Sequence, residues 1–181
     1  MEVLEHPYRS KAHRFEERMT PENNQSHTGG VSTDYRQLQT LVDEGRVEEL
    51  LQQVSVECVT ETWLRYDRTQ SHPKDADDDP DWWAVELWMS NAWWADEVRV
   101  RDALLRLIDA ADDEALSSVA AGPLEVFVTG DASRLAWIEK QAALSEWFRR
   151  ALAQVWAWEL PRETFARLER AARAQLPQPD H

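Results

Sequence analysis

Apolar residues recur every three or four positions through most of the chain between Thr33 and Leu176. This spacing places them along one side of successive helices, because an α-helix has about 3.6 residues per turn. The chain contains only five glycines and few β-branched runs, a composition that disfavours a sheet protein. The sequence therefore predicts an all-α fold, an irregular array of roughly seven to nine helices joined by short loops.

The chain divides into three predicted parts. Residues 1–31 show no sustained apolar period and include the loop-like run NNQSHTGG, so we expect them to form a flexible N-terminal tail. Residues 32–176 are expected to form a single helical domain, since the chain is long enough to bury one full core. Residues 177–181 are expected to be a frayed C-terminus.

The run AAGPLE at Ala120–Glu125 contains the strongest predicted helix boundary. Gly122 can adopt the left-handed conformation that ends a helix, and Pro123 suits the first turn of the next helix. We therefore expect one helix to end at Gly122 and another to begin at Pro123. Glu125 would then lie in a first turn, where the positive end of the helix dipole stabilises a carboxylate.

Other boundaries follow from the same kinds of signal. The apolar stripe from Val47 to Tyr66 predicts one helix of roughly five turns. Asp79 and Pro80 resemble an N-cap followed by the first helical residue. Gly45 is expected to end the first short helix, and Ser145 to cap the helix that carries Phe148. Val98 is expected on the apolar side of the next long helix, and the buried stripe of a later helix is expected to reach Trp156.

The formal charge of −14 is concentrated in one segment. Residues 75–125 carry 14 acidic and 3 basic side chains, a net charge of −11. Such a field disfavours binding to nucleic acid or an anionic membrane and favours a basic protein partner. The candidate contact residues are its densest acids, Asp75, Asp77, Asp78 and Asp79. A solvated surface that only keeps the chain soluble is the alternative.

Two tryptophan doublets supply the second candidate binding feature. Trp82-Trp83 and Trp93-Trp94 cannot both face inward from one stripe, because adjacent helical residues diverge by about 100°. Some of these rings must approach the surface or a second layer of helices. An exposed aromatic ring surrounded by acids is typical of a protein-binding hot spot.

Few residues suggest catalysis or metal binding. Glu125 and Glu139 lie among apolar residues and could act as an acid and a base if they met in a dry cleft, although Arg149 and Arg150 are plausible ion-pair partners. The acidic run after Asp75 resembles a calcium loop, but proline replaces the residue that must take a positive φ. The histidine spacing does not support a zinc site, and no nucleotide-binding glycine loop is present, so we expect no metal and no cofactor.

The order WWA…AAGPLE…IE…WFRRAL resembles a bacterial family of helical domains of unknown function. The matching residues run from about Trp82 to Trp158, and AAGPLE is their most specific part. The resemblance implies an α-helical bacterial protein and brings no established activity.

Three functional hypotheses follow. The first is a non-enzymatic protein-binding module, of an immunity or antitoxin-like kind, that engages a basic partner. The second is an enzyme that uses Glu125 and Glu139, and the third is an acidic inhibitor that mimics DNA. The N-terminal segment has charges throughout and no run is long enough to span a membrane, so we expect a cytoplasmic protein.

Overall fold

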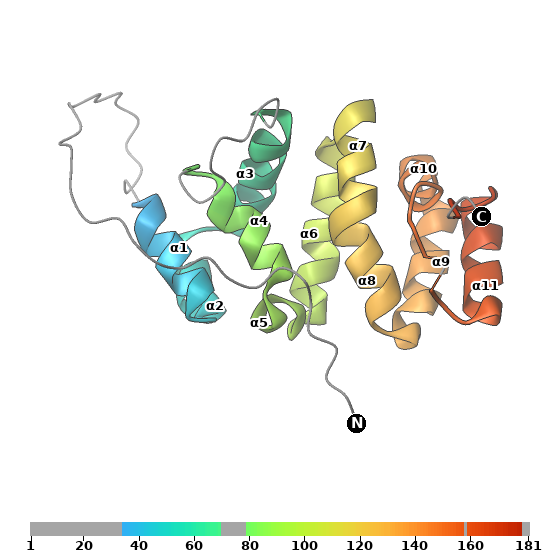
Figure 1. The fold of residues 1–181 in the computed structure, drawn as a ribbon, viewed down its shortest axis with the longest axis horizontal. Helices are drawn as coiled ribbons and strands as arrows, with labels where there is room; N and C mark the ends of the chain where they lie inside the picture. The colour runs from blue at the N-terminus through green and yellow to red at the C-terminus, as the bar shows by residue number, and fades with distance from the viewer. Residues whose placement is uncertain (1–33, 70–78, 158, 179–181) are drawn as a thin grey trace. The chain divides into compact units, whose positions relative to one another are not determined.

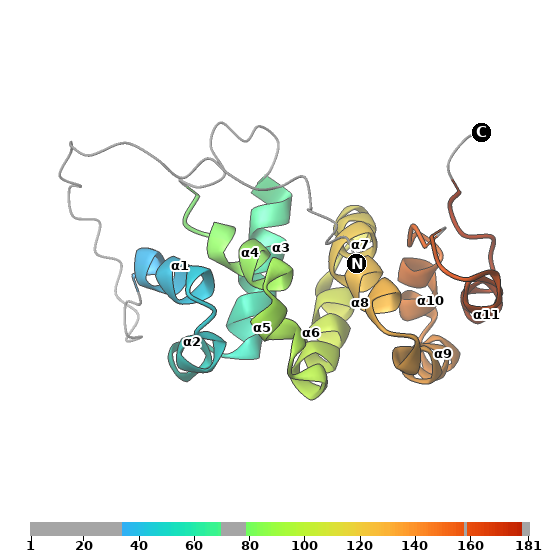
Figure 2. The ribbon, with the colours of Figure 1, turned by 60° about the horizontal axis from the view of Figure 1, so that its bottom comes forward.

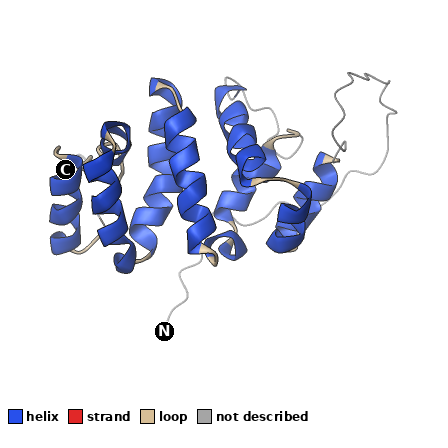
Figure 3. Ribbon diagram, turned by 180° about the vertical axis from the view of Figure 1, so that it is seen from behind, coloured by secondary structure: helices blue, strands red, loops and turns tan. Residues whose placement is uncertain are grey.

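The computed structural model describes residues 34–69, 79–157 and 159–178, and the regular structure within them is entirely helical (Figures 1 and 3). The all-α prediction is therefore confirmed. The predicted tail at 1–31, the last residues 179–181 and three of the candidate acids (Asp75, Asp77 and Asp78) lie outside the described residues.

The helices follow one another with short connections, and several have only one or two turns. In chain order they are α1 (Tyr35–Asp43), α2 (Val47–Gln53), α3 (Val56–Thr69), α4 (Trp82–Met89), α5 (Asn91–Trp94), α6 (Glu97–Ala110), α7 (Asp113–Val119), α8 (Glu125–Gly130), α9 (Leu135–Leu144), α10 (Glu146–Leu152) and α11 (Arg162–Ala172). A π-helical segment, Ala120–Leu124, joins α7 to α8, and a short 3₁₀ turn, Ala132–Arg134, precedes α9.

The apolar stripe from Val47 to Tyr66 belongs to two helices, so the prediction of one long helix is wrong. Val54 adopts an extended conformation (φ −132°, ψ 147°) and ends α2, and α3 begins at Val56. Ser55 accepts a hydrogen bond from the backbone N–H of Cys58 (3.1 Å), as an N-cap does. The spacing of apolar residues continues across the break, which is why periodicity alone did not reveal it.

The boundary predicted at Gly122 and Pro123 is also wrong, because the helical backbone continues through both residues. Gly45 is the only described glycine with a positive φ (68°), so Gly122 does not end a helix. Pro123 has no N–H to donate, and the backbone adopts the wider π conformation around it. The N–H of Glu125 bonds to the carbonyl of Ala120, and Figure 1 shows α7 and α8 as one continuous rod.

Two smaller expectations need correction. The helix predicted to start at Pro80 starts at Trp82, and Asp79 instead accepts a hydrogen bond from the backbone N–H of Asp81 (2.8 Å) in the turn before it. Val98 is 79% exposed, because the buried side of α6 is formed by Val100, Ala103, Leu104, Leu107 and Ile108. By contrast, Ser145 caps α10 as predicted, through the N–H of Phe148 (3.1 Å).

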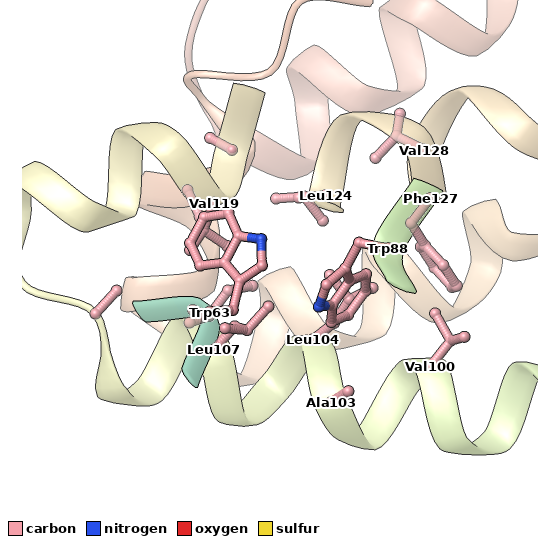
Figure 4. Packing of buried hydrophobic residues seen from close by; sticks show 14 of the residues in the cluster. Trp63, Trp88, Val100, Ala103, Leu104, Leu107, Val119, Leu124, Phe127 and Val128 are labelled. Carbon is pink, nitrogen blue, oxygen red and sulfur yellow. The ribbon is translucent and has the colours of Figure 1, made fainter. Parts of the chain in front are cut away.

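The core is built around α6, which contacts α3, α7 and α10. Figure 2 shows α6 between α3 and the α7–α8 rod. Buried side chains from these helices interlock in Figure 4, where Leu104 and Leu107 of α6 lie below Val119 and Leu124. The described residues form one compact unit. The candidate site, carried by α8 and by the segment between α10 and α11, is thus attached to this core.

Candidate functional site

The two tryptophan doublets lie largely in the interior. Trp83 and Trp93 are buried, and Trp82 and Trp94 are half-buried. Trp82 packs against Tyr66 with ring centroids 5.5 Å apart, and the indole N–H of Trp94 donates to the carbonyl of Trp88 (2.8 Å). The second layer of helices, one of the two outcomes expected for the doublets, therefore accounts for these rings.

Among the described tryptophans, Trp156 is the most exposed, with 47% of its surface accessible. It was expected on the buried stripe of α10, but that helix ends at Leu152 and the chain leaves it before Trp156. Val155 and Ala157 on either side are buried, so the side chains alternate inward and outward along this short non-helical segment. Trp156 is thus held outward by the burial of its neighbours.

Glu125 of α8 lies directly against this segment. Its carboxylate accepts a hydrogen bond from the backbone N–H of Trp156 (3.3 Å). Burial raises the pKa of Glu125, the Trp156 N–H lowers it, and the nearby charge of Glu159 raises it again. The net direction is upward, because removing a carboxylate from water disfavours its charged form. Burial, and not the helix dipole expected from the sequence, therefore sets the direction of the pKa shift of Glu125.

Glu159 completes what we call the Trp156 site, defined as Trp156, Glu125 and Glu159. Glu159 is exposed, and its charge is close enough to raise the pKa of Glu125. Neither carboxylate forms an ion pair with a basic side chain among the described residues. The site therefore combines an exposed tryptophan, bound through its backbone N–H by one acid, with a second acid nearby, and the described part of the chain gives neither acid a cationic partner.

Glu139, the second candidate catalytic carboxylate, has a different environment. Arg167 of α11 binds both of its oxygens, with N–O distances of 2.8 and 2.7 Å. This hydrogen-bonded pair lowers the pKa of Glu139, which opposes a role as a proton donor. Glu125 is not among the groups that shift the pKa of Glu139, and Glu139 is not among those that shift the pKa of Glu125. The structure thus gives the two glutamates separate surroundings.

The arginines proposed as partners of these glutamates bind elsewhere. Arg149 donates to the carbonyl of Ala142 (2.7 Å), and Arg150 pairs with Asp113 (2.5 Å). Arg167 was not predicted as the partner of Glu139. The two residues are 28 positions apart in the sequence, and their side chains meet only because α11 packs on α9.

Many acids of segment 75–125 are neutralised locally by arginine. Six of them form ion pairs with arginines of α3, α6 and α10: Asp81, Asp96, Glu97, Asp102, Asp112 and Asp113. Asp79 is half-buried and caps a turn. The segment's net charge of −11 therefore overstates the negative charge that its described helices offer to a partner.

No three acidic, histidine or cysteine side chains of the described residues are arranged to hold a metal ion. None of the described helices is both long enough and apolar enough to cross a bilayer.

A family model described as a family of unknown function, DUF6869, matches residues 70–176. The match covers more than half of the chain, so the protein belongs to this family. Searches of curated proteins and of solved structures found no match. The family match spans every helix from α4 to α11, including the three residues of the Trp156 site.

Proposed function

We propose that this protein is a non-enzymatic protein-binding module that recognises an arginine- or lysine-containing segment of a partner through the Trp156 site. The observation that carries the proposal is the outward position of Trp156 between two buried neighbours, beside Glu125 and Glu159. Tryptophan is enriched among the residues that dominate binding energy, and its ring face attracts cations.

Single exposed apolar residues are normal on protein surfaces, so exposure alone would carry no argument. Three features distinguish this ring. Trp156 is anchored by the buried Val155 and Ala157, and its backbone N–H is bound by the partly desolvated carboxylate of Glu125. Neither Glu125 nor Glu159 has a cationic partner within the described ranges. A basic side chain would supply that missing charge and could stack on the indole at the same time.

The strength of the interaction can be bounded. A cation–π contact at an exposed ring contributes about 0.5–1 kcal/mol, and each exposed ion pair about 0–1 kcal/mol. These contacts sum to at most about 3 kcal/mol, so we expect a short basic peptide to bind weakly, with a dissociation constant on the order of millimolar or higher. A folded partner that covers more of the surface would bind more tightly.

The alternatives receive less support. Joint catalysis by Glu125 and Glu139 needs the two carboxylates to share a cleft, and their surroundings are separate. A DNA mimic needs an array of unpaired acids, whereas six acids of the acidic segment are paired with arginine. Within the proposed class, an immunity or antitoxin-like role, a bacterial origin and a cytoplasmic location remain predictions from the sequence.

The proposal is tested with three labelled peptides that differ only in carrying arginine, glutamine or glutamate at the same positions. Binding to the intact protein is followed by fluorescence anisotropy at low and physiological salt. We expect the arginine peptide to bind best and to weaken as salt rises, because salt screens charges at exposed sites. The variant Trp156→Ala should lose most of this binding.

The matched control is Leu144→Ala, which removes another exposed apolar side chain on α9. It should bind the arginine peptide as the wild type does. Equal binding of all three peptides, or equal binding by the Trp156→Ala and Leu144→Ala variants, would refute the proposal.

A further inference from the structure

Helices α9 and α11 lie side by side (Figures 1 and 2). A separate recess of about 200 Å³ is lined by residues of these two helices and by Arg173. Three of its lining residues are alanines, whose short side chains leave the space open: Ala142, Ala143 and Ala171. The other lining residues are all charged, namely Glu139, Arg167, Arg170 and Arg173. The recess is thus small, and its polar groups are dominated by guanidinium.

One of the three arginines is already occupied. Glu139 binds Arg167 through both carboxylate oxygens, whereas Arg170 and Arg173 form no ion pair within the part of the chain that the structure describes. The lining groups therefore carry two uncompensated positive charges. Glu163, which lies near Arg167 without lining the recess, is the other acid whose charge acts on that guanidinium.

Arg173 is held in an unusual backbone conformation. Its φ of 55° and ψ of 32° are left-handed, and it is the only described residue other than glycine with a positive φ. This position follows the last turn of α11, where glycine is the common residue because it has no Cβ to clash. Strained residues of this kind cluster at ligand sites, which supports a use for the Arg173 side chain in this recess.

We propose that this recess binds a dianionic phosphate group, either free phosphate or the phosphate of a small monoester. Arginine forks match phosphate oxygens in pairs, and two unpaired guanidiniums balance a dianion. The volume argues for a small ligand, because sites for drug-sized molecules and cofactors occupy about 300–1,000 Å³. The C-terminal end of α11 lies close by, and its partial negative charge repels an anion. The arginines must therefore supply the attraction for the phosphate.

Glu139 has a defined part in this arrangement. Its carboxylate competes with the ligand for Arg167, since both are anions that bind the same guanidinium edge. Replacing it with glutamine should therefore strengthen phosphate binding.

The test is calorimetric titration of the intact protein with inorganic phosphate, and separately with glycerol 3-phosphate, at constant ionic strength and neutral pH. We expect the double variant Arg170→Gln/Arg173→Gln to bind roughly tenfold more weakly or worse, and Glu139→Gln to bind several-fold more tightly. Tighter binding of glycerol 3-phosphate than of phosphate would identify a monoester, and the opposite order would identify free phosphate.

The control is the double variant Arg106→Gln/Arg150→Gln, which removes the same charge from ion-paired arginines outside the recess. It should bind phosphate as the wild type does. Equal weakening by both double variants would reduce the effect to general attraction and overturn the proposal. The proposal would also be overturned if the Arg170→Gln/Arg173→Gln variant bound phosphate as tightly as the wild type, or if Glu139→Gln bound it more weakly. Arg170 and Arg173 are exposed, so the variants should retain the wild-type circular dichroism spectrum.

Discussion

The tryptophans of α4 and α5 and the tryptophan of the segment after α10 have opposite surroundings. Trp88 contacts the rings of both Trp93 and Trp94, and Trp94 lies against Phe127 of α8. These rings come from short consecutive helices with other helices packed against them. Trp156 instead follows a helix end, where only its two neighbours turn inward.

The acids near the two regions differ as well. Around α6, arginines pair with acids one turn away, as Arg101 does with Glu97 and Arg106 with Asp102. At the Trp156 site, Glu125 and Glu159 are near each other, and the described residues provide no cation for either. The contrast shows that neither a cluster of tryptophans nor a cluster of acids in the sequence locates a binding surface. The arrangement of the neighbouring helices decides which side chains remain available.

The largest expected effect is on stability. Trp93 is fully buried, so Trp93→Ala should lower the free energy of unfolding by about 3–5 kcal/mol through lost burial and a residual cavity. Trp156→Ala should lower it by about 1 kcal/mol or less, because much of that ring already faces water. Urea denaturation monitored by circular dichroism measures both values. Similar losses for the two variants would erase the distinction between the regions.

The next largest effect is the change in stability expected for a substitution at Gly122, which lies in the continuous helix that leads to Glu125. A Cβ added at Gly122 would meet no atom within 4 Å, and the backbone there is helical. Gly122→Ala should therefore stabilise the protein by about 0.5–1 kcal/mol, through the better helix propensity of alanine. Thermal unfolding would show a higher midpoint. A clear decrease in the unfolding midpoint would instead support a helix end that requires glycine at position 122.

The smallest effect concerns the pH dependence of stability at Glu125. Burial raises the pKa of Glu125 in the folded state. The contribution of this side chain to the free energy of unfolding is therefore fully present below the usual glutamate pKa of about 4.3, and it is lost as pH rises through the folded-state pKa. Glu125→Gln should therefore match the wild type near pH 4 and be slightly more stable at neutral pH. Melting temperatures measured from pH 4 to 8 compare the two proteins. Greater stability of the wild type at neutral pH would show that Glu125 is stabilised as an anion.

Local signals predicted much of the fold. Apolar spacing identified the helical class, Ser145 was a correct cap, and Gly45, with its positive φ, ends α1 as its position suggested. The errors share a physical cause. A helix can absorb Pro123 by widening, and a stripe can continue across an extended residue such as Val54, and neither event changes the pattern of apolar residues.

The candidate site was harder to predict. Glu125 was recognised as a carboxylate among apolar residues, but its contact with Trp156 spans 31 residues and depends on how α8 packs near the segment after α10. The spacing of apolar residues could not have marked Trp156, because Phe148, Leu152, Val155 and Trp156 continue a helical stripe at positions i, i+4, i+7 and i+8. The pairing of Glu139 with Arg167 likewise depends on helix packing that no local pattern records.

The most direct measurement is the response of the individual indole N–H resonances to the arginine peptide in ¹H–¹⁵N correlation spectra of the intact protein. The Trp156 signal is assigned from its loss in Trp156→Phe, and those of the buried Trp83 and Trp93 from the corresponding phenylalanine variants. The account predicts that the Trp156 resonance shifts progressively with peptide concentration, while the resonances of Trp83 and Trp93 stay in place. Shifts at the buried rings with none at Trp156 would contradict it, and so would the absence of any shift at saturating peptide.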